Sequence, residues 1–159
     1  MNIEILCIGN LKEGYWRDAA GEYLKRLAPY CKTRVTELRE TRLPKGAGAA
    51  GEAEVVRREG EALLAAAGTG RFCAALDIRG SRLSSEAFAE KLGELACGGE
   101  SDLCFVIGGS LGLSAAVLAR ADLRLSFSDM TFPHQLMRVI LLEQLYRGFK
   151  ILRNEPYHK

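Results

Sequence analysis

The chain has 159 residues, a length typical of one domain with enough interior for a hydrophobic core. Hydrophobic residues make up 48% and charged residues 26%, close to the average for soluble globular proteins, which argues against a disordered or fibrous class. Lys and Arg number 22 against 20 for Asp and Glu, a formal net charge of +2. Because the whole chain is nearly neutral, any surface that binds nucleic acid must be local.

Cysteine usage and the first residues predict a cytoplasmic protein. Five cysteines are spread over the chain: Cys7, Cys31, Cys73, Cys97 and Cys104. Their number is odd and no pair has C-x-x-C spacing, so we expect free thiols in a reducing compartment. The opening residues MNIEILCIG contain Glu4 and no basic leader, so we expect no signal peptide. No stretch approaches the ~18 consecutive apolar residues of a membrane-spanning helix.

Strand and helix patterns alternate through the first half of the chain. A β-branched run over residues 3–8 predicts a strand, and apolar residues at helical spacing over 16–27 predict the helix that follows. Residues 33–38 are typical of a second strand. After a glycine- and alanine-rich stretch, a helix is predicted to resume at about Glu52, weakened at mid-length by Gly60.

The same alternation continues through the second half. Apolar runs at 72–76 and 103–107 predict strands covered on both sides, and alternating residues at 123–127 predict a last strand. Helices are expected over about 84–96 and over 133–149, the second with Pro133 at its first position. This order predicts an α/β fold in which a mostly parallel sheet is covered by helices on both faces.

Three strand ends carry residues that suit a ligand site, because ligands of open parallel sheets bind at the carboxyl ends of the strands. These segments are 76–80, 107–112 and 126–134. The second has the pattern G-G-x-x-G, which differs from the dinucleotide fingerprint G-x-G-x-x-G, and the chain lacks the G-x-x-x-x-G-K-[ST] motif of triphosphate sites. Its glycines either admit a ligand close to backbone amides or form a tight strand-to-helix turn.

The third segment is polar but nearly uncharged. Serine and threonine side chains lie there among Phe127, Met130 and Phe132, a mixture that suits a pocket for an aromatic base better than a phosphate cradle. The alternative is an ordinary loop in which Thr131 caps the next helix. The two histidines of the chain lie far apart, so we expect no metal site, and the lack of a G-x-S-x-G elbow disfavours a hydrolase.

The last helix and the tail each allow two interpretations. Residues 139–142 are apolar on almost every side of the helix, which indicates either a subunit interface or core packing. From Arg147 onward, cations that include Arg153 and Lys159 face only Glu155. This local surplus suits RNA phosphates, or it belongs to a solvated terminus.

Four stretches together resemble one family: Ile107–Gly112, Leu125–Arg138, Glu143–Arg147 and Pro156–Lys159. They are similar to the ribosomal RNA large subunit methyltransferase H family of the SPOUT superfamily. The resemblance extends over the whole chain in length and strand order, and its last third is the most specific. It implies a single SPOUT methyltransferase domain over residues 1–159 whose C-terminal part, about 72–159, is tied into a deep trefoil knot. True knots are rare, so no residue pattern predicts this one.

The resemblance also implies a reaction. Members of the family bind S-adenosyl-L-methionine in the knot and act as homodimers. They methylate N3 of pseudouridine 1915 in helix 69 of 23S rRNA, within the assembled ribosome. A chain without a metal-site pattern suits methyl transfer, because the protein need mainly align donor and acceptor. A local basic tail on a nearly neutral chain suits one folded RNA site.

Carried over by position, the resemblance implies that the cofactor meets the following residues: Leu76, Gly108, Gly109, Phe127, Ser128, Asp129, Met130, Thr131 and Phe132. The candidate catalytic residues are His158, Tyr157 and Arg138, and the candidate RNA contacts are Arg153 and Lys159. Histidine, with a reference pKa of ~6.5, suits removal of the imide proton, and solvent at mildly alkaline pH is the alternative base. Tyr157 would stack on the base or hydrogen-bond to its carbonyl, and Arg138 would neutralise charge.

Two other functions fit these patterns. A SPOUT methyltransferase that acts on tRNA would keep the fold and change the acceptor. A non-catalytic ribosome-associated module would keep the fold and lose turnover. A nucleotide-binding regulatory domain would need a phosphate cradle, which the sequence lacks.

Overall fold

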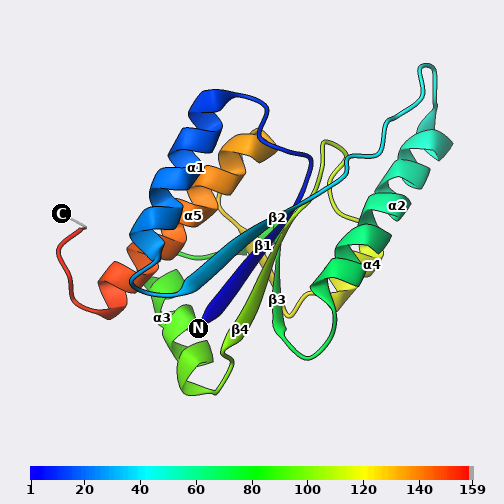
Figure 1. Cartoon of the computed structure of the whole chain (residues 1–159). Coiled ribbons are helices and arrows are strands. Elements are labelled where there is room, and N and C mark those ends of the chain that lie inside the picture. The colour runs from blue at the N-terminus through cyan, green and yellow to red at the C-terminus, as the bar shows by residue number, and fades with distance from the viewer. Residues whose placement is uncertain (158–159) are drawn as a thin grey trace.

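Five parallel strands form one sheet in the order β2-β1-β4-β3-β5, in a computed structural model that describes residues 1–157 (Figure 1). The strands are β1 (Asn2–Ile8), β2 (Lys32–Leu38), β3 (Phe72–Arg82), β4 (Asp102–Ile107) and β5 (Leu123–Ser126). The helices are α1 (Gly14–Leu27), α2 (Ala49–Ala67), α3 (Ser85–Cys97), α4 (Ala115–Arg120) and α5 (His134–Leu152). The predicted α/β fold with a parallel sheet is therefore confirmed. Within residues 1–157, no helix is both long enough and apolar enough to cross a membrane.

Helices cover both faces of this sheet. Figure 1 shows α1, α3 and α5 on one side of the strands and α2 and α4 on the other. Side chains of β1 alternate between the two sides: Ile3, Ile5 and Cys7 join the core beneath α1, α3 and α5, whereas Leu6 and Ile8 join the core beneath α2 and α4. Burial on both faces explains why the central strands are almost wholly apolar in sequence.

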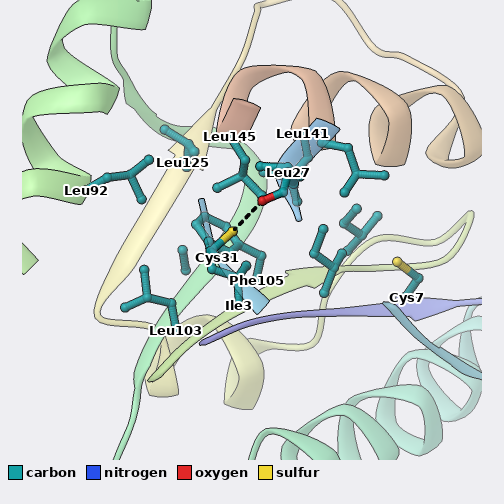
Figure 2. Packing of buried hydrophobic residues seen from close by; sticks show 14 of the residues in the cluster. Ile3, Cys7, Leu27, Cys31, Leu92, Leu103, Phe105, Leu125, Leu141 and Leu145 are labelled. Carbon is teal, nitrogen blue, oxygen red and sulfur yellow. Dashed lines mark hydrogen bonds between the residues drawn. The ribbon is translucent and has the colours of Figure 1, made fainter. Parts of the chain in front are cut away.

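The larger core lies between the sheet and the three helices on its first face. Figure 2 shows Leu27 of α1, Leu92 of α3 and Leu145 of α5 among the side chains that pack around Phe105 of β4. Each of these residues is at most 1% exposed. Complete burial of such a side chain contributes about 1.5–3 kcal/mol, so apolar contact is the main force that holds α5 on the sheet. Leu141, in the apolar stretch 139–142, is part of this core.

Element boundaries differ from the predicted ones in several places. α2 begins at Ala49 and continues through Gly60, where a Cβ would lie 2.2 Å from the hydroxyl oxygen of Ser114. Glycine is thus required for α2 to approach the residue that caps α4. Pro133 is the N-cap of α5 rather than its first residue. α4 has only six residues, too few for a periodic pattern to predict it.

The cysteines are all free, as expected. Cys7, Cys31, Cys73 and Cys104 are buried, and Cys97 at the end of α3 is exposed. Burial raises the pKa of the Cys7 thiol to about 11, which keeps it protonated near neutral pH.

Candidate functional site

A cavity of about 780 Å³ opens at the carboxyl ends of β3, β4 and β5. Its walls come from three segments at the carboxyl-end parts of these strands, 76–79, 107–113 and 125–134, together with Leu118 of α4 and Met137 of α5. The volume lies in the ~300–1,000 Å³ range of sites for small molecules. The three strand ends singled out in the sequence therefore meet around one hollow.

The glycine-rich segment after β4 forms a tight turn at the cavity wall. The Gly112 N–H donates to the Gly109 carbonyl oxygen over 3.0 Å, and Gly112 has a φ of +81°, in the left-handed region that favours glycine. A Cβ at Gly108 would lie 2.8 Å from the Gly112 carbonyl oxygen. The turn itself thus requires these glycines. Gly108 and Gly109 also line the cavity. Both interpretations of the glycine-rich segment therefore hold: it is a tight turn, and its backbone forms a wall of the cavity.

The end of β3 forms a bulge that shapes the second wall. The pairing register of β3 with β5 shifts between Leu76 and Ser81, so β3 extends past the predicted end at residue 76 and continues to Arg82. A Cβ at Gly80 would lie 2.5 Å from the Arg124 carbonyl oxygen, so the bulge packs closely on β5. Leu76 and three residues of the bulge line the cavity.

The segment after β5 forms the third wall and is held by hydroxyl groups. The buried Ser126 hydroxyl lies 3.1 Å from the carbonyl oxygens of both Ile78 and Ser128 and can donate to either. The Met130 N–H donates to the Ser128 Oγ over 2.9 Å. These contacts fix the backbone of the loop and tie it to the bulge of β3. Apolar rings of Phe127 and Phe132 also line the cavity.

The described lining residues carry little charge. Asp77 accepts hydrogen bonds from the Arg124 guanidinium, at 2.5 Å for its Nη2, and from the Arg79 N–H at 3.2 Å. Burial raises the pKa of Asp77, but these hydrogen bonds outweigh burial and hold the pKa below its usual value. No lysine is among the lining residues described, and residues 1–157 contain no cluster of three or more side chains that could bind a metal ion. The cavity suits an apolar, aromatic ligand held by backbone hydrogen bonds.

The candidate cofactor residues are largely brought together. Eight of them line the cavity: Leu76, Gly108, Gly109, Phe127, Ser128, Met130, Thr131 and Phe132. Asp129 is the exception, because its carboxylate pairs with Arg82 on the outside of the loop. Met130 is 73% exposed and forms part of the rim rather than the floor.

Arg138, a candidate catalytic residue, lies in the interior and does not line the cavity. Its Nη1 donates to Glu37 at the end of β2 over 2.5 Å, and its Nη2 donates to the Gly9 carbonyl oxygen over 3.0 Å. The Leu11 N–H donates to the same Glu37 oxygen over 3.2 Å. Arg138 thus fastens the first turns of α5 to the carboxyl ends of β1 and β2.

The tail lies away from the cavity of its own chain. The Tyr157 hydroxyl donates to Glu143 over 3.1 Å, and its ring centroid lies 4.8 Å from the Arg147 guanidinium carbon. Arg153 stacks over the Tyr30 ring at 4.5 Å. The cavity reaches α5 only as far as Met137, and Glu143 lies roughly 9 Å farther along the helix. The remaining tail candidates, His158 and Lys159, lie outside the described residues.

Several lining residues were not assigned to the site from sequence. They include Leu113, Leu118 and Met137; Ile78 and Arg79 also line the cavity and lie in the segment 76–80 singled out from sequence, but no ligand contact was assigned to them. Their positions follow from the bulge of β3 and from the packing of α4 and α5, neither of which leaves a periodic signal in the sequence. The only available signal was their closeness to the three strand ends.

The whole chain is similar to known methyltransferases. A family model described as a predicted SPOUT methyltransferase matches residues 1–158. Ribosomal RNA large subunit methyltransferase H of Pelotomaculum thermopropionicum is 56% identical over 157 residues, which cover 99% of this chain and 98% of that protein. The protein of the same name from Carboxydothermus hydrogenoformans is 52% identical over 159 residues, the full length of both.

One solved structure with a similar fold is that of a probable methylase family protein from Haemophilus influenzae Rd KW20. Its TM-score is 0.57 at 14% sequence identity, and the match covers 99% of this chain and 70% of that chain. At this identity the likeness concerns the fold alone.

The position of Arg138 generates a stability prediction. Replacement of Arg138 with Ala should lower the free energy of unfolding by about 2–4 kcal/mol, less than for a fully buried pair because Glu37 is 40% exposed and can hydrate. Urea unfolding monitored by circular dichroism measures this change. The control Arg58→Ala removes a pair whose two side chains are 61% and 42% exposed and should cost less than about 1 kcal/mol. An Arg138→Ala protein as stable as the parent would contradict the anchoring role.

Proposed function

Because the chain belongs to the SPOUT methyltransferase family, we propose that it methylates ribosomal RNA of the large subunit. The acceptor in this proposal is N3 of pseudouridine 1915 in helix 69 of 23S rRNA, modified in the assembled ribosome in the cytoplasm. The observation that carries the proposal is the nearly uncharged, backbone-lined cavity at the carboxyl edge of the sheet, in a chain whose relatives are named rRNA methyltransferases.

The residues of the cavity fit S-adenosyl-L-methionine, the donor that SPOUT methyltransferases generally use. Phe127, Phe132 and Leu76 offer apolar contact for the adenine ring, and the turn at Gly108 and Gly109 presents backbone groups for hydrogen bonds. The donor supplies a methyl group already activated on a sulfonium, so the chain needs no metal ion for this chemistry. The protein's part is to hold donor and acceptor in line and to exclude water.

The acceptor N3 carries a proton that must leave as the methyl group arrives. Burial, followed by the neighbouring Tyr23 and Glu143, raises the pKa of Tyr157, so its hydroxyl stays protonated. In this proposal the hydroxyl exchanges its hydrogen bond to Glu143 for one to a carbonyl oxygen of the base. His158 or solvent then takes the N3 proton. Arg138 serves this reaction by positioning α5, since its guanidinium is already bound to Glu37 and Gly9.

The proposed enzyme is a homodimer with composite sites. Tyr157 and Arg153 do not reach the cavity of their own chain, so in this proposal they contact RNA beside the cavity of the partner subunit. The chain would act as one SPOUT domain over residues 1–159. Family membership also supports the deep trefoil knot over about 72–159, the part that includes all three walls of the cavity.

Donor binding can be tested with one bulky side chain. Thr131 is exposed and lines the cavity, so Thr131→Trp should fill space that the donor needs and weaken its binding at least about tenfold, equivalent to about 1.4 kcal/mol. Isothermal titration calorimetry with S-adenosyl-L-methionine measures the affinity. The matched control Thr69→Trp, at the opposite edge of the sheet, should bind like the parent. If the parent and both variants bind S-adenosyl-L-methionine with equal affinity, the cavity is not the donor site.

The acceptor can be tested in cells and in vitro. Mass spectrometry of 23S rRNA from a strain that lacks this gene should show one methyl group missing from the helix 69 fragment, restored by the purified protein acting on ribosomes. Labelled donor is then incubated with ribosomes, free rRNA and bulk tRNA. Label on tRNA alone would establish the tRNA acceptor instead, and no label on any RNA would establish a non-catalytic module.

If the cavity of one subunit and the tail of its partner form each site, two inactive variants should complement each other. A Thr131→Trp chain lacks a usable cavity, and a chain cut after Glu155 lacks the tail, so each alone should be inactive. Co-expressed, they should recover about a quarter of the parental activity, because half of randomly mixed dimers are hybrids and each hybrid has one intact site. Methyl transfer to ribosomes is the measurement. Activity in the truncated chain alone would show that the tail is not required.

A further inference from the structure

Most Lys and Arg side chains within residues 1–157 form ion pairs with carboxylates of the same chain. The cations without an ion pair in this described part are concentrated at one edge of the sheet. Five of them lie at the carboxyl ends of the strands: Lys12 follows β1, Arg39, Arg42 and Lys45 follow β2, and Arg79 lies in the bulge of β3. All five are exposed. Elsewhere, Lys25, Lys32 and Arg153 also lack an ion pair, but they are scattered over other parts of the surface. Arg17 lacks one too, but its guanidinium donates to the carbonyl oxygens of Leu11 and Lys12.

At the opposite edge of the same sheet, where the amino ends of the strands lie, cations pair with carboxylates of the same chain. There the buried carboxylate of Glu4 accepts hydrogen bonds from Arg34 over 2.6 Å and from Arg71 over 2.7 Å. Arg120 likewise pairs with Asp122 over 3.1 Å. At the carboxyl edge, the segment 39–48 contains three cations and only Glu40 to oppose them. The chain therefore concentrates uncompensated positive charge at one edge while its net charge stays near zero.

This charged edge adjoins the cavity. Figure 1 shows the segment between β2 and α2 beyond the same end of the strands as the loop after β4. Strands lie ~4.8 Å apart, so the ends of β2 and β3 are separated by about 14 Å in this strand order. Arg79 itself lines the cavity. One RNA stem-loop can thus contact several of these cations while it offers a base to the cavity.

A buried acid fixes the charged segment relative to the cavity wall. Glu59 of α2 is 4% exposed, and its Oε1 accepts the Thr41 N–H over 2.9 Å. A Cβ at Gly109 would lie 2.8 Å from Glu59 Oε2, so the backbone of the glycine turn rests on the other oxygen of the same carboxylate. One side chain therefore contacts both segments, and Arg42 directly follows the residue that it holds.

We propose that Lys12, Arg39, Arg42, Lys45 and Arg79 form a carboxyl-edge basic surface that binds backbone phosphates of the RNA whose base enters the cavity. The proposal rests on the proposed function. Exposed cations that form no ion pair within the chain are free to replace the counterions of a polyanion, whereas cations already paired would first have to break an ion pair. Phosphate contacts of this kind position a substrate and carry no base specificity, which the cavity must supply.

The test compares two triple variants with the same loss of charge. Arg39→Gln/Arg42→Gln/Lys45→Gln alters the proposed surface. Lys25→Gln/Lys32→Gln/Lys91→Gln removes the same charge elsewhere: Lys25 and Lys32 are exposed, and Lys91 is half-buried and paired with Glu94. The edge variant should raise KM for ribosomes by about tenfold or more with little change in kcat, because it removes binding shared by ground and transition states. In filter binding to purified 23S rRNA, the slope of log K against log salt concentration should fall in magnitude by about two to three.

The controls separate this surface from the site itself. The control variant should change KM less than about twofold, and both variants should bind S-adenosyl-L-methionine like the parent in calorimetry, since none of the altered residues lines the cavity. Equal losses of RNA binding in the two variants, or none in either, would overturn the proposal. If the parent methylates no rRNA, the proposed function fails, and the rRNA-binding comparison still decides whether the edge is an RNA surface.

Discussion

The structure depends on one constraint: a parallel sheet covered by helices on both faces leaves only its edges open to ligands. The carboxyl ends of β3, β4 and β5 are the place where strand backbone must turn, and the turns are built from glycine and serine rather than charged residues. A ligand that enters there meets backbone amides and aromatic rings. A neutral, aromatic ring such as adenine suits such walls far better than a triphosphate does.

A second constraint is the buried guanidinium of Arg138. Its contacts with Glu37 and with the Gly9 carbonyl oxygen join three parts of the chain that are far apart in sequence. A buried guanidinium without its partners would be left unsatisfied, so these contacts restrict where α5 can lie. Because the first turn of α5 forms part of the cavity, a residue that does not touch the ligand still determines the shape of its site.

The distribution of charge links the cavity to its substrate. Internal carboxylates such as Glu4 neutralise the amino edge of the sheet, whereas the segment with Arg39, Arg42 and Lys45 remains uncompensated at the carboxyl edge. A nearly neutral protein with one basic edge binds polyanions weakly overall and orients them when it does. That arrangement suits an enzyme that must present one base of a folded RNA to a small, uncharged cavity.

Local patterns in the sequence determined the strands, most of the helices and the fold class, because each depends on periodicity over a few neighbouring residues. They also indicated the three strand ends, and family motifs indicated eight residues that line the cavity. Tertiary structure alone decided that Arg138 is an anchor, that Asp129 faces outward and that β3 continues through a bulge. These features depend on contacts between residues tens of positions apart, which no local pattern records.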